Sequence, residues 1–257
     1  MPRGRFAASA LLSLATVMGT PSSGAIAGEA SPNAGLIPPQ SVRNVLDHGA
    51  SCDARSDDTR AIQSELFLAA GQAIVFVPAA RTCMVGGLQI PSKTHFTIDG
   101  TLRLIPGANA TVLNVVTGGR SVRFDGTGTI DGSRSGQTAG EIAGIASLNA
   151  RDIAISNLTI QHVRNWPVNI AATTDCVLEN LTINDGGNAP EFAAGSTNCW
   201  ARNLRISNIS DEAFAFYGGV TNSGITGSVL KGGTASGISV LADRAQSRAN
   251  PQDSPHS

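Results

Sequence analysis

Short runs of alternating apolar and polar residues, rich in β-branched side chains, recur along most of the chain. Four of these runs align with one another: RDIAISNLTI from Arg151, TDCVLENLTI from Thr174, TNCWARNLRI from Thr197 and TNSGITGSVL from Thr221. Alternation over such short runs predicts strands rather than helices. A polar turn and a second short apolar run follow each segment, so each repeat contains at least two strands.

The repeat has a nearly constant period. Asn157, Asn180, Asn203 and Gly227 occupy the same position in it, and their residue numbers differ by 23, 23 and 24 (180 − 157, 203 − 180, 227 − 203). Tandem helix pairs need more than about 30 residues, and the LxxLxL spacing of leucine-rich repeats is absent. Short strands joined by turns at this period are typical of a parallel β-helix, whose coils stack to bury a core. We predict an all-β parallel β-helix over residues 94–241, with about six coils.

Residues one period apart should lie on top of one another. Asn157, Asn180 and Asn203 would then form an amide ladder. Two of them also begin Asn-Leu-Thr sequons, but repetition at the coil period favours the structural interpretation. Side chains stacked at strand spacing are about 4.8 Å apart.

The four cysteines can pair in three ways. Cys176 and Cys199 are separated by one period, which places them in neighbouring coils at a distance that suits a disulfide. Cys52 and Cys83 form the second candidate pair. Stacked or buried free thiols remain the alternative. No C-x-x-C motif indicates a zinc cluster.

Composition narrows the function classes. Only 14% of the residues are charged, 29 are glycines and the net charge is −1. A nucleic-acid partner is not expected, because phosphate binding requires a basic excess. Stacked coils also disfavour like charges at strand spacing, which explains the low charge.

The first residues are typical of a targeting segment. Arg3 and Arg5 precede a weakly apolar run over residues 6–19, and Ala25-Ile26-Ala27 has the form of a cleavage site. The run is shorter than the roughly 20 residues of a membrane span. We expect a signal peptide over 1–27, a loose segment over 28–41, no membrane span and a secreted or periplasmic protein. A buried N-terminal helix is the alternative.

Residues 42–93 have a different character and are predicted to form an N-terminal cap. Asp57 and Asp58 are good N-cap residues, and Ile62 and Leu66 follow at helical spacing. Gly71 would end this short helix, and the strand IVFVPA follows. Such a helix would cover the open end of the core.

The cap also carries a family resemblance. The run DHGASCDARSDDTRAIQSEL, followed by AIVFVPAARTCMV, resembles the opening of pectate lyase superfamily proteins. Their relatives include polygalacturonase-type enzymes (glycoside hydrolase family 28-related), tailspike-like lyases and epimerase-like proteins. The resemblance covers about residues 42–241. It implies a single-stranded right-handed parallel β-helix and a carbohydrate substrate.

The candidate catalytic residues also come from this resemblance. ISDEAFAF, from Ile209, is similar to the polygalacturonase element G-D-D-C-(I/V)-A-I, with Asp211 and Glu212 on the two Asp positions. Asp185 is a third catalytic candidate. A solvated turn is the alternative interpretation of these acids.

The sequence departs from the family at its other elements. Counting back one period gives Asn188 and Ala189 where the family has the Asp of N-T-D-G. Ser236 stands where the family has the His of G-H-G, and the R-I-K element would lie beyond residue 257. At most one of four signature elements is therefore kept.

Further polar residues should lie on the same side of the coils and contact substrate. An Arg or Lys there suits a uronate carboxylate, and an aromatic ring can stack on a sugar. Taken singly, each is as consistent with an ordinary surface position. The substrate-binding candidates are His162, Arg164, Glu191, Tyr217 and Lys231.

Two functions follow from these features. The first is an exported protein that cleaves an acidic polysaccharide by hydrolysis or β-elimination. The second is a truncated or non-catalytic β-helix with a binding or structural role. No metal site or cofactor is predicted, although calcium would suit a lyase. Residues 242–257 form an irregular polar tail without a visible cap, so a partner chain is expected to cover that end of the helix.

Overall fold

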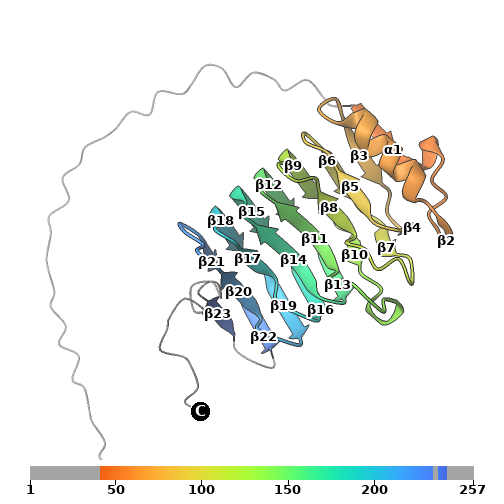
Figure 1. Cartoon of the computed structure of the whole chain (residues 1–257). Helices are drawn as coiled ribbons and strands as arrows, with labels where there is room; N and C mark the ends of the chain where they lie inside the picture. Colours follow the sequence, from red (N-terminus) through yellow and green to blue (C-terminus); the bar gives the residue numbers. More distant parts are fainter. Residues whose placement is uncertain (1–40, 234–236, 242–257) are drawn as a thin grey trace, which may run out of the picture. The chain divides into compact units, whose positions relative to one another are not determined.

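The computed structural model describes residues 41–233 and 237–241, which form a right-handed parallel β-helix with three sheets (Figure 1). All strand pairs are parallel, and each sheet takes about one strand from every coil. The predicted signal peptide, the polar tail and Ser236 lie outside the described residues, as does nearly all of the loose segment. Within the described part, no helix is long and apolar enough to cross a membrane.

The strands alternate regularly among the three sheets. Sheet A contains β1 (Ser41–Asn44), β3 (Ala73–Val77), β6 (His95–Ile98), β9 (Arg120–Asp125), β12 (Arg151–Ser156), β15 (Thr174–Glu179), β18 (Thr197–Arg202) and β21 (Gly224–Thr226). Sheet B contains β2 (Asp53–Asp57), β4 (Thr82–Val85), β7 (Thr101–Leu104), β10 (Thr129–Asp131), β13 (Thr159–Val163), β16 (Thr182–Gly186), β19 (Arg205–Ile209) and β22 (Val229–Gly233). Sheet C contains β5 (Leu88–Ile90), β8 (Leu113–Val115), β11 (Ala143–Leu148), β14 (Trp166–Ala171), β17 (Glu191–Ala193), β20 (Phe214–Tyr217) and β23 (Ile238–Leu241).

The predicted fold class is confirmed, but the count of about six coils is too low. Sheets A and B have eight strands each, because β1 and β2 already belong to the first coil. Sheet C has seven strands. In the first coil the helix α1 (Thr59–Ala69) lies between β2 and β3, at the place in the chain order where later coils have a sheet C strand. The segment over 42–93 therefore contains coil strands as well as the helix.

Helix α1 lies at the N-terminal end of the stack and packs against β3 and β5 (Figure 1). Its buried side chains include Ile62 and Leu66. Asp58 is the N-cap residue but makes no side-chain hydrogen bond to the first turn, whereas the carboxylate of Asp57, one position earlier, accepts from the backbone N–H of Thr59 at 2.9 Å. A second short helix, η1 (Val45–His48), precedes β2.

The core is built from columns of aligned side chains. In sheet B, Leu102, Ile130, Ile160, Ile183 and Ile206 stack in register and are at most 1% exposed. Fully burying one such side chain contributes about 1.5–3 kcal/mol. The coils therefore stabilise one another through this shared core.

The polar ladder predicted at one turn is confirmed. Asn180 donates to the Oδ1 of Asn157 at 3.1 Å, and Asn203 donates to the Oδ1 of Asn180 at 3.2 Å. All three residues have φ between 54° and 61°, and Gly227 continues the column at φ 61°. Asn accepts this left-handed conformation better than most residues, which explains its repetition at the turn.

Disulfides join Cys176 to Cys199 and Cys52 to Cys83. Cys176 and Cys199 are direct partners in the register of β15 and β18, with Cα atoms 4.4 Å apart. The Cys176–Cys199 disulfide therefore links two neighbouring coils. The Cys52–Cys83 disulfide links the residue before β2, in the first coil, to β4 in the second.

Strands β21, β22 and β23 are the last in their sheets within the described residues. Several of their apolar side chains are exposed, and Val240 reaches 80%. The partner chain expected at this end stays a prediction.

Candidate functional site

Two neighbouring hollows open where the sheet B strands turn toward sheet C, and Asn188 lines both. We call them the acidic hollow and the arginine hollow. The acidic hollow, of about 560 Å³, is lined by Glu141, Trp166, Asn188, Ala189, Glu191, Asp211, Glu212, Ala215, Tyr217 and Leu241. The arginine hollow, of about 980 Å³, is lined by Arg103, Asp131, Ser133, Arg134, Ser135, Gln137, His162, Arg164, Asn165, Asp185, Gly187 and Asn188.

Strands β17 and β20 position the carboxyl groups of the acidic hollow. The core side of these strands is fixed by Phe192 and Phe214, which are fully buried and packed edge to face with centroids 5.3 Å apart. Alternation then turns Glu191 outward, beside Ala215 in the register. The small side chain of Ala215 leaves space in front of the sheet.

Burial and like charge act together on Glu191. Burial, with the negative charges of Asp211 and Glu212, raises the pKa of Glu191 to about 7. Among the described residues that line this hollow there is no Lys or Arg to oppose that shift. At pH values below about 7 this carboxyl therefore carries a proton.

The adjacent carboxyls of Asp211 and Glu212 hydrogen-bond to each other. Burial, followed by that hydrogen bond and the neighbouring charge, raises the pKa of Asp211. The hydrogen bond from Asp211 lowers the pKa of Glu212, which also accepts from Ser239. The pair thus holds a first proton on Asp211 while Glu212 is ionised.

This arrangement combines a carboxyl that can donate a proton with a carboxylate that can accept one. Acid–base catalysis near neutral pH requires one group that is protonated and one that is ionised. Such a pair arises when the environment raises one pKa and lowers the other. The aromatic rings of Trp166 and Tyr217 line the same hollow and offer flat apolar surfaces beside the carboxyls.

The arginine hollow differs because its acids have cationic partners. Asp131, whose side chain is 5% exposed, lies 3.4 Å from the Nε of Arg103 and 3.3 Å from the Nδ1 of His162. Asp185 is ion-paired with Arg134. With three arginines and two aspartates, the lining carries a net charge of +1 when histidine is neutral.

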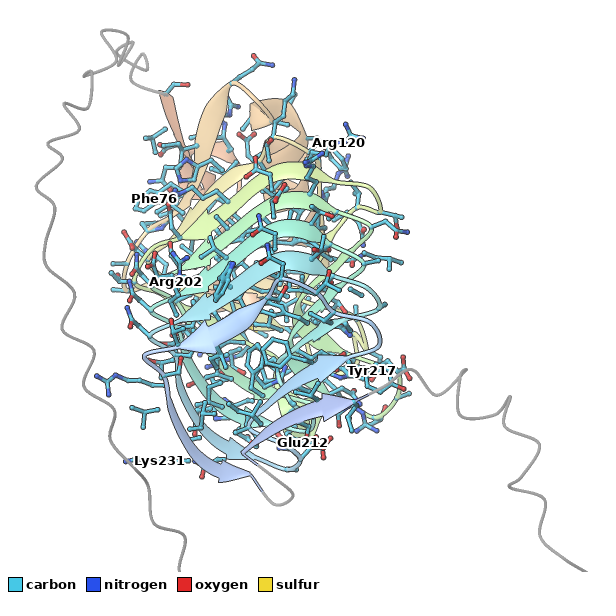
Figure 2. All side chains as sticks on the ribbon, turned by 90° about the vertical axis from the view of Figure 1, so that its left-hand side faces the viewer. Phe76, Arg120, Arg202, Glu212, Tyr217 and Lys231 are labelled. Atoms are coloured by element: carbon cyan, nitrogen blue, oxygen red, sulfur yellow. A yellow bond between two sulfur atoms is a disulfide. The ribbon has the colours of Figure 1, made fainter. Side chains whose placement is uncertain are left out.

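The structure divides the predicted site residues between the two hollows. Glu191 and Tyr217 lie with Asp211 and Glu212 in the acidic hollow, whereas Asp185 lies with His162 and Arg164 in the arginine hollow. Lys231 lines neither of them. Figure 2 shows Glu212 and Tyr217 on one side of the last coils and Lys231 at the opposite margin.

Asn188 borders both hollows, one sequence repeat before Asp211. The offset between the paired residues Gly186 and Ile209 in sheet B is 23 (209 − 186), and the offset between Glu191 and Ala215 in sheet C is 24 (215 − 191). The coil that carries Asp211 and Glu212 therefore gains one residue between these two pairs. The match of Asn188 to the Asp of the family's motif stays a prediction from the sequence.

Several lining residues were not identified from the sequence because they belong to one long coil. The offset between Ile145 and its partner Leu113 is 32 (145 − 113), whereas the offset between Val168 and Ile145 is 23 (168 − 145). The extra length lies around the short helix η2 (Arg134–Gly136). It supplies Glu141 to the acidic hollow, and Arg134 and Gln137 to the arginine hollow. Insertions in one repeat often mark a binding face, so the length of this coil was the available signal.

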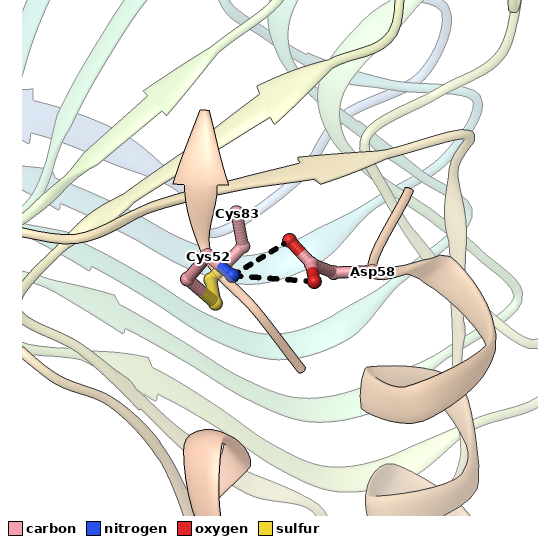
Figure 3. Close-up of side chains that lie close together, drawn as sticks. All are labelled: Cys52, Asp58 and Cys83. Carbon is pink, nitrogen blue, oxygen red and sulfur yellow. Dashed lines mark hydrogen bonds between the residues drawn. A yellow bond between two sulfur atoms is a disulfide. The ribbon is translucent and has the colours of Figure 1, made fainter. Parts of the chain in front are cut away.

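A cluster near the N-terminus has the composition of a metal site but not its chemistry. Cys52, Asp58 and Cys83 form the one group of three such residues found within the described ranges (Figure 3). The two sulfurs are bonded to each other, so neither is a thiolate ligand. Asp58 is 2% exposed, and its carboxylate accepts hydrogen bonds from the backbone N–H groups of Ser51, Cys52 and Met84. The cluster therefore fixes the junction between the first two coils.

Comparisons with known proteins agree with this architecture. The family model described as rhamnogalacturonase A/epimerase, pectate lyase-like matches residues 42–239. No curated protein sequence matches the chain.

Solved structures with the same fold include two exopolygalacturonases. The family 28 enzyme from Yersinia enterocolitica has a TM-score of 0.66 at 15% identity, over 79% of this chain and 53% of its own. The hyperthermoactive enzyme from Thermotoga maritima has a TM-score of 0.60 at 14% identity, over 80% of this chain and 66% of its own. The A-module of a mannuronan C-5 epimerase from Azotobacter vinelandii has a TM-score of 0.53 at 18% identity, over 78% of this chain and 76% of its own. This chain thus spans only about half to two thirds of the two exopolygalacturonases.

Proposed function

Because this chain belongs to the rhamnogalacturonase A/epimerase, pectate lyase-like family, we propose that it is an exported protein that cleaves an acidic, pectin-like polysaccharide. The acidic hollow is the proposed reaction centre. Glu191 acts as the acid that protonates the leaving oxygen. The pair of Asp211 and Glu212 acts as the base that activates water.

The observation that carries this proposal is the partly buried position of Glu191 beside Asp211 and Glu212, in a hollow without a Lys or Arg among its described lining residues. A carboxyl with a pKa of about 7 can donate a proton under neutral conditions, where an ordinary glutamate is already ionised. Glycoside hydrolysis needs this acid together with a second, ionised carboxyl. Glu212, whose pKa is lowered by the hydrogen bond from Asp211, meets that second requirement.

The hollow favours hydrolysis over β-elimination. Elimination needs a base at the sugar carbon next to the carboxylate and a cation that neutralises that carboxylate. The acidic hollow has no Lys or Arg among its described lining residues, whereas it has both carboxyls that hydrolysis uses. The proposed hydrolysis uses carboxyl groups alone, so a chelator should not change its rate.

The test is a cleavage assay on polygalacturonate, rhamnogalacturonan and polymannuronate. Wild type should release new reducing ends without the ultraviolet absorbance of an unsaturated uronate. Glu191→Gln should lower kcat by about 10²–10⁴-fold. Glu179→Gln, on the outer side of β15 in sheet A, is the matched control and should keep the wild-type rate. Equal rates for wild type and Glu191→Gln would exclude the assignment, and an unsaturated product would exclude hydrolysis.

A second candidate function is glycan binding without cleavage. Asn188 supports it, because counting back one repeat from Asp211 gives this amide where the family's motif has an Asp. Retained binding of a polyuronate with no product from any substrate would favour this function over the first.

A further inference from the structure

The arginine hollow has a volume of about 980 Å³. It collects three arginines in a chain that has only 18 Lys and Arg residues in all. The rest of its lining is polar, with two each of Asp, Ser and Asn beside Gln137, His162 and Gly187, and the acidic hollow adjoins it at Asn188. The net positive charge of this hollow, beside the proposed reaction centre, favours an anionic ligand.

One of the three arginines has no acidic partner. Arg164 is half-buried, and its Nη1 donates a hydrogen bond to the backbone carbonyl of Gln137 at 3.0 Å. Within residues 41–233 and 237–241, no carboxylate lies within ion-pair distance of its guanidinium, in contrast to Arg103 and Arg134. Its remaining N–H groups make no hydrogen bond to described residues, so they are available to a ligand.

The contact that holds Arg164 is itself fixed. Gln137 is 3% exposed, its Oε1 accepts from the backbone N–H of Asn109 at 2.8 Å, and its Nε2 donates to the carbonyl of Ile105 at 3.1 Å. The residue that orients Arg164 is therefore anchored from the preceding coil. A preorganised guanidinium loses less entropy on binding than a mobile surface arginine.

The ligand chemistry follows from the donors and from the neighbouring hollow. A guanidinium matches the two oxygens of a carboxylate with paired hydrogen bonds. Arg134 extends from the arginine hollow toward the reaction centre, where its Nη2 donates to the Oγ of Ser210 at 3.2 Å. Ser210 directly precedes Asp211 in the sequence. One linear chain can thus occupy both hollows, with an acidic sugar at the arginines and a glycosidic bond at the carboxyls.

We propose that the arginine hollow is a binding site for a carboxylate-bearing sugar of the glycan, with Arg164 as the residue that selects an acidic sugar over a neutral one. This site rests on the proposed function and deepens it, because it names the charge that the substrate must carry next to the bond that is cleaved. Arg164 contacts the carboxylate, and the ion pair of Arg134 with Asp185 lines the same hollow.

The experiment measures binding separately from cleavage. Calorimetric titrations use the Glu191→Gln protein, which prevents turnover, with a uronate oligosaccharide, its carboxyl-reduced neutral counterpart and inorganic phosphate. The uronate should bind at least about tenfold more tightly than the neutral chain. Adding Arg164→Gln should remove that difference without changing the affinity for the neutral chain, and Arg164→Lys should restore part of it. Adding Arg60→Gln, at an exposed position of α1, is the control and should change nothing.

The outcomes separate this inference from the proposed function. Unchanged uronate binding in the Arg164→Gln protein, with thermal unfolding like that of its parent, overturns the inference even if Glu191→Gln abolishes cleavage. Equal affinities for the uronate and the neutral chain, or phosphate binding as tight as that of the uronate, also overturn it. If Glu191→Gln cleaves normally while Arg164→Gln loses uronate selectivity, the proposed function fails and the binding site stands.

Discussion

The two hollows contain similar acidic side chains but differ in the charges of the residues beside those acids. In the arginine hollow, Asp131 and Asp185 each have a cationic partner. In the acidic hollow, the charged residues that line the space with Glu191 are all acids within the described part of the chain, and its pKa rises to about 7. The partners of an acid, rather than the number of acids, therefore decide which hollow can hold a transferable proton.

The largest expected difference between the hollows is in turnover. Asp211→Asn should lower kcat by about 100-fold or more, because it disrupts the carboxyl pair that activates water. Asp185→Asn should leave kcat near the wild-type value and lower KM, because it removes negative charge from the arginine hollow. Steady-state kinetics on the cleaved substrate measure both effects. A loss of kcat in Asp185→Asn as large as that in Asp211→Asn would mean that the two hollows share one chemistry.

The next difference is in stability. Asp131→Asn should lower the free energy of unfolding by about 1–3 kcal/mol, because it leaves Arg103 and the buried end of the hollow without their carboxylate. Urea unfolding measures this change. The control is Asp152→Asn at an exposed position on β12, which should stay within about 0.5 kcal/mol of wild type. Equal stabilities of the two variants would show that the pairing of Asp131 contributes little.

The third expected effect is a pH dependence of stability that comes from Glu191 in the acidic hollow. The pKa of Glu191 is raised from 4.5 to about 7, so between these values the folded state binds more protons than the unfolded state. The free energy of unfolding should therefore fall as pH rises through this window. Glu191→Gln should remove this loss and be about 1–2 kcal/mol more stable than wild type above pH 7, after allowance for its partial exposure.

Thermal unfolding of wild type and Glu191→Gln across that pH range gives the measurement. A wild-type stability that stays level or rises with pH through the same window, with no gain from the substitution, would show that Glu191 ionises at an ordinary pH.

The smallest expected effect concerns the ion pair of Arg134 and Asp185 in the arginine hollow. Arg134 and Asp185 are about one third exposed, so Arg134→Gln should cost no more than about 1 kcal/mol of stability. The same substitution should weaken uronate binding, because it removes one of three cations from the hollow. A large loss of stability would mean that the ion pair is structural rather than part of a binding surface.

The fold could be predicted from the sequence where the coils have equal length. The offset in residue number from β12 to β15 equals the offset from β15 to β18 (174 − 151, 197 − 174), which brought out the strands, the Asn ladder and the pairing of Cys176 with Cys199. The earlier coils are irregular. The offsets between sheet A partners are 32, 21 and 28 at β1–β3, β3–β6 and β6–β9 (73 − 41, 95 − 74, 123 − 95). Helix α1 and longer turns break the period there, so a periodic search misses two coils.

The candidate site was predictable only in part. Asp211 and Glu212 are adjacent in the sequence, so a motif could indicate them. The raised pKa of Glu191 depends on residues one coil away and on burial, which no local pattern encodes. Asp185 is ion-paired instead with Arg134, which comes from an extended coil 51 residues earlier in the sequence.

The central claim is that the acidic hollow keeps one carboxyl protonated at near-neutral pH. Carbon-13 NMR of protein labelled at the glutamate side-chain carboxyls, with Glu191→Gln to assign the resonance, measures it directly. The account predicts a midpoint for Glu191 close to 7. A midpoint near about 4.3, the value of an unperturbed glutamate, would contradict it.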